Sequence, residues 1–551
     1  MSGRLGAFLR TATADQQTLV RTLDIVREMP FVLMLAKTSQ PTAETTSGRR
    51  LSRLVGLVVS AVIAGIFLYR VFGGVDPTVR FFDDFFYYVK PAKNLVDGAG
   101  STYFPGEHTN GYHPLWFLWL AFLWLITGGG TLFFGLVDVS LMLLMLGFFF
   151  LYQRFLRRVT GTALPAAIGA ALAAIPLATI ATAGVELALT VFAAALLLDV
   201  LTRKPLAQQG LKDAAIVGLL AAGLVLSRLD AAILAPGLVV AVGRRWNWKM
   251  WAAFAAGTSP VAMYFAFNIL VYGHTGTTSM TAKSLAVYWP PNLHSLTLDE
   301  QMSAAGMIIL LAVVVVIGLA RRIENADMRR IAVALAVTPL LQLLFHTVFS
   351  GWMLFPWYFY LTDMMLGLGA ALISALVASR WPRTPIMRWA LIPASLVAVV
   401  VAAAGVFVGI RPNSHQAEIA VLARQLQQFA SERPGVYAMG DAAGTPGWIM
   451  RQPIVHLEGL MMSHDFINRI RQRQPLDRVF RDYHVSFYVA VWSVDIGNGC
   501  RRTTEPGPLQ SSPRSPHMEM TICAKPIAVI APGPIYQVRI YRIDPNTGQA
   551  V

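Results

Sequence analysis

The feature that most restricts this chain is a series of apolar stretches, most of them close to the length of a membrane-spanning helix. A helix needs about 20 apolar residues to cross a hydrocarbon core of about 30 Å, and several stretches are shorter. Twelve candidates can be counted, at residues 51–72, 114–127, 131–151, 163–181, 185–202, 213–226, 230–243, 250–272, 304–320, 330–348, 358–379 and 389–410. Only 14% of the residues are charged, whereas an ordinary soluble domain carries about 25%. The sequence therefore predicts a polytopic α-helical membrane protein.

Lys and Arg collect between these stretches, so the formal charge of +15 is expected to orient the chain in a membrane and not to bind nucleic acid. The basic clusters, all expected on the cytoplasmic side, are Arg49, Arg50 and Arg53; Arg154, Arg157 and Arg158; Arg203 and Lys204; Arg244, Arg245 and Lys249; Arg321, Arg322, Arg329 and Arg330; and Arg380, Arg383 and Arg388. Only one net crossing then fits between residue 113 and Arg154, although two apolar stretches lie there. We expect residues 114–127 to be re-entrant or to lie along the surface, which leaves about eleven spans.

The composition changes after Arg411, where a helical pattern, "HQAEIAVLARQLQQFA", precedes four short strand patterns, "GVYAMGD", "PIVHL", "VSFYVAVW" and "YQVRIYRI". Residues 500–518 are expected to form an exposed loop. Cys500 and Cys523 can form one disulfide in an oxidising compartment, and two free thiols remain the alternative. The predicted organisation is a cytoplasmic segment 1–50, a membrane module 51–410 with a large first outer loop at 73–113, and an extracytoplasmic α/β domain 411–551.

The first outer loop opens with "FFDDFFYYVK" at residues 81–90, which places Asp83 and Asp84 among aromatic rings. Adjacent like charges beside apolar rings raise at least one pKa, so keeping both acids implies a cation, a metal ion or a reaction that uses them. The two carboxylates could hold Mg²⁺ or Mn²⁺, which prefer oxygen ligands. A helix cap or turn is the structural alternative. Further along the loop, "PAKNLVDG" predicts a short helix that begins at Pro91 and ends at Gly98.

Other polar residues on the outward side interrupt the apolar pattern, and an ionisable group at membrane depth needs a partner or a watery cavity. Together they suggest a polar cavity that opens outward. The residues are Glu186, Arg228, Asp230, His274, Lys283, Trp357 and Tyr358. A structural ion pair is the favoured interpretation of Arg228 and Asp230. For Asp441, Glu458 and His464, a structural turn is favoured over contact with a ligand.

A wider pattern surrounds the acid pair. The stretch "YYVKPAKNLVDGAGSTYFPGEHTNGYHPLWFLWLAFL" follows it, and "AGVELALT", "LSRLDAAIL", "NILVYGHTGTTSMTAKS" and "GDAAGTPGWIMRQPIVHLEGLMM" come later. This pattern resembles the GT-C fold glycosyltransferases that use polyprenyl-phosphate sugars, above all bacterial relatives of protein mannosyltransferases and arabinosyltransferases. The likeness extends from residue 51 to about 490. The sequence departs from it at Glu458, where an Asp is more common, so the acceptor cannot be carried over.

The resemblance implies transfer of a sugar from a polyprenyl-phosphate donor to an extracytoplasmic glycan, lipid or protein acceptor, at the bacterial inner membrane. Asp83 is expected to be the general base and Asp84 an orienting or metal-binding group, with the reverse assignment open. The residues expected to bind the donor phosphate are Lys283, Arg228 and Lys90. The residues expected to bind substrate are Tyr87, Tyr88, His108, Asn110, His113, Glu186, Asp230, His274, Trp357 and Tyr358.

Two other functions remain as alternatives. A secondary transporter would also need a polar cavity, but no repeat relates two halves of the chain. A polymerase or ligase that uses a glycan linked to a lipid diphosphate would differ in its donor and not in its fold.

Overall fold

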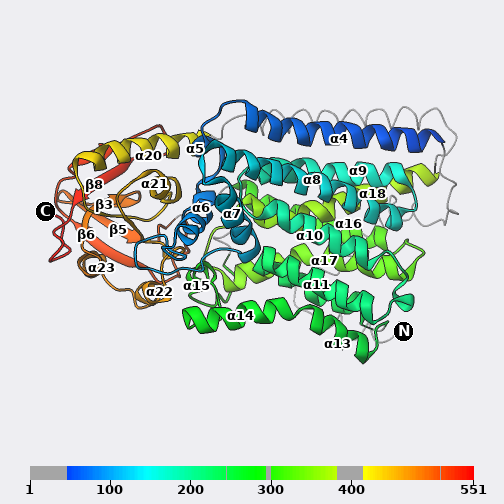
Figure 1. The fold of residues 1–551 in the computed structure, drawn as a ribbon. Coiled ribbons are helices and arrows are strands. Elements are labelled where there is room, and N and C mark those ends of the chain that lie inside the picture. Colours follow the sequence, from blue (N-terminus) through cyan, green and yellow to red (C-terminus); the bar gives the residue numbers. More distant parts are fainter. Residues whose placement is uncertain (1–45, 244, 293–299, 381–413, 509) are drawn as a thin grey trace, which may run out of the picture.

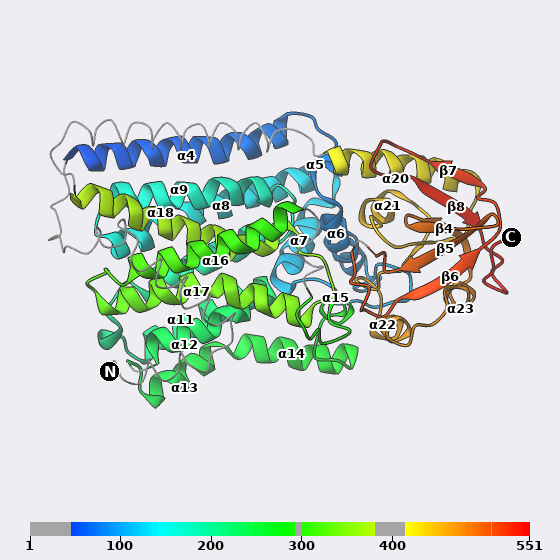
Figure 2. The same cartoon turned by 180° about the vertical axis from the view of Figure 1, so that it is seen from behind.

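The structure, a computed structural model, describes residues 46–243, 245–292, 300–380, 414–508 and 510–551. A bundle of helices forms one part, and a smaller domain of helices and strands lies at one end of it (Figure 1). Figure 2 shows the same division from behind. The predicted stretch 389–410, the segment 1–45, and Arg244, Arg383 and Arg388 lie outside the described residues.

In the bundle, five described helices are long and apolar enough to cross a membrane: α4 (Thr46–Phe72), α8 (Gly130–Thr160), α9 (Ala163–Ala181), α17 (Ala326–Phe349) and α18 (Tyr360–Arg380). Helices α13 (Trp248–Gly257) and α14 (Ser259–Tyr272) form a sixth candidate that bends by 47°. The other described helices of the bundle are α7 (Pro114–Thr127), α10 (Leu187–Leu201), α11 (Leu211–Ser227), α12 (Leu234–Val242) and α16 (Glu300–Ala320). The predicted helical membrane fold is confirmed, whereas the count of eleven spans stays a prediction.

Close packing at the centre of the bundle depends on small residues. Helix α9 is rich in alanine, and a Cβ atom at its Gly169 would lie 2.3 Å from the carbonyl oxygen of Gly367 in α18. Small side chains at such contacts let two helix backbones approach one another closely. The α9–α18 contact therefore allows no larger residue at Gly169 unless the helices move apart.

The first outer loop differs from its prediction. Helix α5 (Pro77–Arg80) precedes α6 (Asp83–Val96), which begins eight residues before the expected start at Pro91 and contains that proline in its interior. The acid pair explains the early start. Asp83 and Asp84 occupy the first turn, where a negative charge interacts favourably with the helix dipole and stabilises the helix. Helix α7 follows; it has 14 residues and is about 21 Å long. The re-entrant or surface placement of residues 114–127 stays a prediction.

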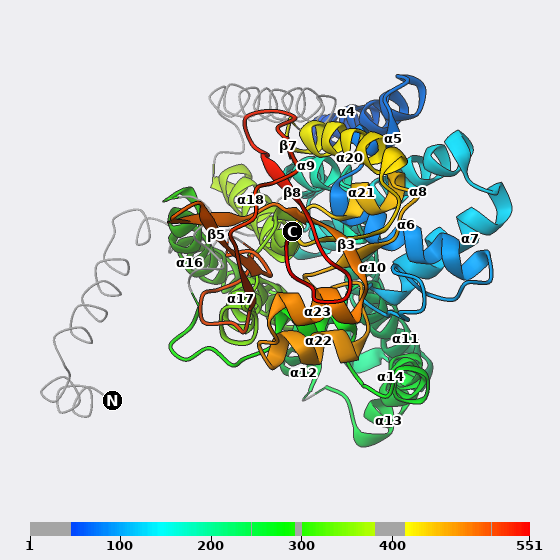
Figure 3. The ribbon, with the colours of Figure 1, turned by 90° about the vertical axis from the view of Figure 1, so that its left-hand side faces the viewer.

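The C-terminal domain is built on a five-stranded sheet in the order β2-β1-β3-β8-β7. The strands are β1 (Val436–Met439), β2 (Ile454–His456), β3 (Val485–Ala490), β7 (Ala528–Ile530) and β8 (Val538–Arg542), and β1 pairs in parallel with β2 and β3. Neighbouring side chains of β1 point to opposite faces. Tyr437 packs with helix α20 (Ser414–Glu432), and Ala438 with α22 (His464–Arg471) and α23 (Leu476–Asp482). Figure 3 shows these helices around the sheet. The predicted helix and four strands are confirmed.

The predicted exposed loop at 500–518 is wrong, because its first part forms a strand and Gln510, Ser511, Ser512 and Ser515 in the rest are buried. Strands β4 (Ser493–Gly497), β5 (Cys500–Glu505) and β6 (Met518–Ile522) form a second, three-stranded sheet. The turn from β4 to β5 uses Gly497, Asn498 and Gly499, which all have positive φ, a conformation that glycine and asparagine tolerate. Cys500 and Cys523 form a disulfide beside this sheet, as one of the two alternatives predicted.

Candidate active site

A cavity of about 830 Å³ lies where the membrane bundle meets the C-terminal domain. Its wall combines the end of α4, helices α5 and α6, the loop at 352–357, the start of α20, and the loops that follow β1 and β2. The acid pair Asp83 and Asp84 lines it, together with Lys283, Tyr87 and Trp357 among the residues that the sequence singled out.

The two adjacent acids have different surroundings. Both carboxylate oxygens of Asp83 accept hydrogen bonds from the C-terminal domain, at 2.9 Å from the backbone N–H of Gly444 and 2.6 Å from that of Thr445. These two residues begin the short helix α21 (Gly444–Ile449). A Cβ atom at Gly444 would lie 2.2 Å from the carbonyl oxygen of Asp83, so only glycine fits this contact. Asp83 therefore joins the first outer loop to the C-terminal domain.

Asp84 faces the cavity and is only partly buried, whereas Asp83 is 4% exposed. Among the described residues, no hydrogen bond or ion pair holds the Asp84 carboxylate. Desolvation raises the pKa of Asp84 to about 7, and the charges of Asp83, Glu458 and Glu186 act in the same direction against the opposing effect of Lys283. Burial also raises the pKa of Asp83, although its two backbone hydrogen bonds oppose that shift. Asp84 thus has free lone pairs and a pKa close to neutrality.

Two further acids line the same cavity from the C-terminal domain. Asp441 follows β1, Glu458 follows β2, and burial raises the pKa of each to about 8. Asp441 accepts a hydrogen bond from the Trp492 indole at 3.3 Å. Glu458 lies 3.3 Å from His456, but burial lowers the pKa of His456 to about 3, so this neighbour is neutral. Both acids stand in turns, as the sequence predicted, and both also face the cavity, which the sequence analysis did not favour.

Lys283 is the one lysine among the described residues that line the cavity. It ends helix α15 (Thr278–Lys283), and its ammonium group donates a hydrogen bond to the Tyr358 hydroxyl at 3.1 Å. Burial alone would lower its pKa, but the interactions with Tyr358 and with Asp84 outweigh that effect and raise the pKa of Lys283 above its usual value. It is therefore a cation at neutral pH.

Two arginines that sequence reasoning missed line the membrane-proximal side of the cavity. Arg70 lies in the last turn of α4 and Arg80 ends α5, and both reach the buried Asp138 of α8, at 2.9 Å and 3.4 Å. Two guanidinium groups around one carboxylate leave a net positive charge there. Asp138 lies within the predicted apolar stretch 131–151, and an acid inside such a stretch is a signal that could have revealed this cluster.

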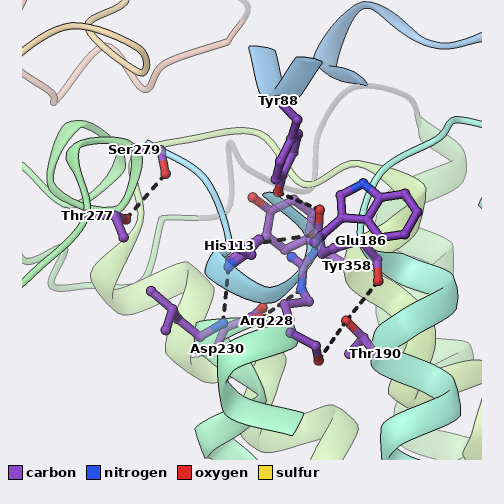
Figure 4. A network of polar contacts seen from close by, with 12 residues as sticks. Tyr88, His113, Glu186, Thr190, Arg228, Asp230, Thr277, Ser279 and Tyr358 are labelled. Carbon is purple, nitrogen blue, oxygen red and sulfur yellow. Dashed lines mark hydrogen bonds and ion pairs between the residues drawn. The ribbon is translucent and has the colours of Figure 1, made fainter. Parts of the chain in front are cut away.

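Other predicted residues form a separate network beside the cavity (Figure 4). Arg228, which is 1% exposed, pairs with Glu186 at 2.5 Å and with Asp230 at 2.8 Å. The guanidinium carbon of Arg228 lies 4.3 Å from the centre of the Tyr358 ring. Tyr88 donates a hydrogen bond to Glu186 at 2.7 Å, and His113 lies 3.6 Å from the same carboxylate. His346 completes the network, 3.1 Å from Asp230.

Most of the remaining predicted residues make contacts that join separate loops of the chain. Lys90 lies 4.3 Å from the centre of the Tyr103 ring, and burial lowers its pKa to about 8. Asn110 accepts a hydrogen bond from the backbone of Thr278 at 2.9 Å and so fixes α15. His274 stacks on His464 at 4.0 Å, and His108 is exposed. None of these residues is among those that line the cavity in the described parts of the chain.

The described residues contain no group of three or more His, Cys, Asp or Glu side chains spaced to hold a metal ion. The chemistry of the acid pair suits a divalent cation in part, because carboxylate oxygens are the preferred ligands. Both oxygens of Asp83 already accept backbone hydrogen bonds, however, which leaves Asp84 as the more available ligand. Binding of Mg²⁺ or Mn²⁺ stays a prediction.

No protein-family model and no curated protein matches the sequence. Among solved structures, the chain is similar to the apo oligosaccharyltransferase of Archaeoglobus fulgidus, at 11% identity and a TM-score of 0.51, covering 80% of this chain and 69% of that one. It is similar to archaeal AglB from Archaeoglobus fulgidus in complex with an inhibitory peptide and a dolichol-phosphate, at 10% identity and a TM-score of 0.51, covering 81% and 70%. Apo ArnT from Cupriavidus metallidurans is similar at 13% identity and a TM-score of 0.50, covering 81% and 93%.

At these identities the likeness defines the fold. The membrane bundle, the outer loop with its acid pair and the C-terminal domain together have the GT-C fold. The resemblance read from the sequence motifs is thereby confirmed at the level of the fold.

Proposed function

We propose that this protein is a membrane glycosyltransferase that moves a sugar from a polyprenyl-phosphate donor to an extracytoplasmic acceptor. The observation that carries the proposal is the cavity itself, which joins a carboxylate with free lone pairs to a cationic and apolar wall beside the membrane bundle. The fold supports the proposal, because similar structures are an oligosaccharyltransferase and AglB with a bound dolichol-phosphate. The multi-pass membrane bundle would keep such a donor in the lipid.

In this proposal the acceptor hydroxyl attacks the anomeric carbon of the donor sugar. The new carbon–oxygen bond forms as the bond between that carbon and the phosphate oxygen breaks, so the lipid phosphate leaves with the electron pair. The hydroxyl proton passes to a carboxylate. Direct displacement of this kind inverts the anomeric configuration, and a product with the donor's configuration would contradict it.

We assign proton removal to Asp84 and the positioning of the loop to Asp83, which reverses the assignment favoured by the sequence. Asp84 makes no hydrogen bond within the described parts of the protein, and its pKa of about 7 suits a base at neutral pH. Both oxygens of Asp83 are already occupied by α21. The two carboxylates thus have separate tasks although they are adjacent in the sequence.

The leaving phosphate needs cations, and the cavity supplies them at its membrane-proximal side. Lys283, Arg70 and Arg80 all line it, whereas Arg228 is paired inside the bundle. Guanidinium groups can donate two hydrogen bonds to a phosphate in parallel. Trp357 and Tyr87, also in the cavity wall, offer aromatic faces to the sugar or the lipid.

The proposal is tested with the purified full-length protein in detergent and a panel of radiolabelled polyprenyl-phosphate monosaccharides. We expect one sugar to support release of polyprenyl phosphate, and Asp84→Asn to abolish that release. Asp97→Asn is a matched control, because Asp97 lies just beyond the other end of α6 and, within the described parts of the chain, its one ion pair is with Lys93 at the surface. A donor linked through a lipid diphosphate forms a second arm, and consumption of that donor alone would favour the ligase alternative. If no donor is consumed, the proposal fails.

A further inference from the structure

The parallel strands of the C-terminal domain bring three polar side chains to one edge of the sheet. Strands β2, β1 and β3 are parallel neighbours, and Glu458, Asp441 and Trp492 each stand two residues beyond the end of one of them. Strand β8 runs in the opposite direction, and Tyr536 stands two residues before its start. All four residues line the active-site cavity. Open α/β sheets bind ligands beyond the carboxyl ends of their strands, where the strand order changes direction, which happens here between β1 and β3.

One acid at this edge has hydrogen-bonding capacity that the protein does not use. Glu458 is 4% exposed, yet its Oε1 atom has no hydrogen-bond partner among the described residues. Buried polar atoms are nearly always hydrogen-bonded in folded proteins. The side chain lies in the cavity wall, so a donor group of a ligand in the cavity would satisfy it.

An aromatic side chain is held beside the second acid. The Trp492 indole donates its hydrogen bond to Asp441 at 3.3 Å, and a Cβ atom at Gly507 would lie 2.5 Å from the Cδ1 atom of the ring. Tyr536, which is 4% exposed, lies 3.0 Å from the His415 ring through its hydroxyl oxygen. An aromatic ring suits the apolar C–H face of a sugar, and carboxyl groups bind its hydroxyls.

The charge state of the two acids indicates which ligand chemistry fits. Burial raises the pKa of Asp441 and of Glu458 to about 8, so both carry a proton for much of the time at neutral pH. A protonated carboxyl group both donates and accepts hydrogen bonds, as a hydroxyl group does. Lys283 is a cation in the same cavity and would repel a positively charged ligand. The sheet edge therefore suits a neutral compound with several hydroxyl groups.

We propose that the acceptor of the transfer reaction is a neutral carbohydrate, held at this sheet edge by Asp441, Glu458 and Trp492. The inference rests on the proposed function, because it names the acceptor of that reaction. The cations assigned to the donor phosphate lie on the membrane-proximal side of the cavity, so donor and acceptor would occupy different walls. Asp84 lies close enough to Glu458 for their charges to interact, so a hydroxyl of the bound sugar would be near the proposed base.

The test measures binding of neutral methyl hexopyranosides to the full-length protein by saturation-transfer NMR, without donor and in a detergent that has no sugar head group. We expect saturable binding of at least one glycoside, and a loss of about tenfold in affinity in Trp492→Ala and in Glu458→Ala. Trp492→Phe keeps a ring but not the N–H group and should lose less. The matched control is Glu432→Ala, since Glu432 is exposed at the end of α20, outside the cavity.

Two further probes represent the other acceptor chemistries. Preferred binding of methyl 2-amino-2-deoxyglucopyranoside would indicate a site for a cation and overturn the proposal. Binding of a threonine-containing tripeptide in place of the glycosides would favour a protein acceptor and overturn it as well. Glycoside affinities that are equal in the wild type, Trp492→Ala and Glu458→Ala would place the sugar elsewhere.

A transfer assay separates this inference from the proposed function. With the donor present, the bound glycoside should be converted to a disaccharide, and Trp492→Ala should raise the KM for the glycoside while the KM for the donor is unchanged. Consumption of donor by a protein that binds no glycoside would overturn the carbohydrate acceptor alone. Binding of a glycoside without consumption of any donor would contradict the transfer reaction, and with it the role of the sugar as acceptor.

Discussion

Two groups of buried charges lie side by side in this protein, and they are built in opposite ways. In the network around Arg228, the carboxylates of Glu186 and Asp230 both pair with the guanidinium group. Tyr88 donates a further hydrogen bond to Glu186, and His346 lies 3.1 Å from Asp230. In the cavity, the described lining residues include four carboxylates, from Asp83, Asp84, Asp441 and Glu458. The cations that line it pair elsewhere, Arg70 and Arg80 with Asp138 and Lys283 with the Tyr358 hydroxyl. The carboxylates of the first group pair with a cation of the protein, and those of the second form no ion pair with a charged partner among the described residues.

The difference shows where binding is to be expected. Buried charges that pair with one another hold a fold together, but their functional groups are already used. Buried acids without cationic partners raise one another's pKa, and such groups mark sites that bind or react. Residue type alone does not separate the two cases, because both groups contain Asp, Glu and basic residues.

The largest expected effect comes from removing the Asp84 carboxylate. Asp84→Asn should reduce the rate of sugar transfer by about 10²–10⁴-fold, which is the usual contribution of a general base. The melting temperature should stay within a few degrees of the wild type, because Asp84 makes no hydrogen bond among the described residues. Rates are measured with the donor identified by the panel. Wild-type activity in a folded Asp84→Asn protein would show that the cavity acid is not the base.

Breaking the ion pairs around Arg228 should lower the stability of the protein. Arg228→Met leaves Glu186 and Asp230 buried without a cation, which typically costs about 3–5 kcal/mol. We expect a marked fall in melting temperature in detergent. Adding Glu186→Gln to this variant removes one of the two uncompensated acids and should restore part of the loss. A variant as stable as the wild type would contradict the structural role of the network.

The cavity acids, which have no charged partner, should make the stability of the folded protein depend on pH. The folded-state pKa of Glu458 is raised to about 8, so the folded protein binds more protons than the unfolded chain between about pH 4.5 and 8. The stability contributed by this group is therefore lost as pH rises through that window. Glu458→Gln should gain at least about 1 kcal/mol on the wild type between pH 5 and 8, the free energy of one pKa unit. Parallel pH profiles of the two proteins would contradict this.

The smallest effect concerns Lys283, whose charge lowers the pKa of Asp84. In Lys283→Gln that influence is gone, so the pKa of Asp84 should rise. The acidic limb of the pH–rate profile should then move to higher pH. The KM for the donor should also increase if Lys283 contacts the phosphate. An unmoved limb would place Lys283 too far from Asp84 to influence it.

Much of this organisation was predictable from the sequence. The apolar stretches predict the membrane bundle, and the acid pair just after the first stretch predicts a site in the outer loop. The pattern of "GVYAMGD" predicts a short strand. Local composition carries these signals, since each depends on residues that are close together in the chain.

Other parts depend on contacts that no local pattern contains. The hydrogen bond from the Gly444 backbone to the Asp83 carboxylate joins residues 361 positions apart. Because it engages Asp83, Asp84 is the acid of the pair that has no hydrogen bond among the described residues. Arg70 at the end of an apolar helix is typical of a side chain that reaches for the membrane surface, so its pairing with Asp138 was not expected. Strand β5 was missed because its "CRRTTE" sequence is polar and is stabilised by pairing with β4 and β6.

The most direct test of the account is the pH dependence of a single turnover in three proteins: the wild type, Asp83→Asn and Asp84→Asn. We predict that the wild-type rate rises with pH up to about 7, where Asp84 ionises. Asp83→Asn should keep that limb at a reduced rate, since the base remains but its loop is held less firmly. Asp84→Asn should be slow at every pH and lack the limb. A limb that persists in Asp84→Asn and disappears in Asp83→Asn would contradict the assignment and make Asp83 the base.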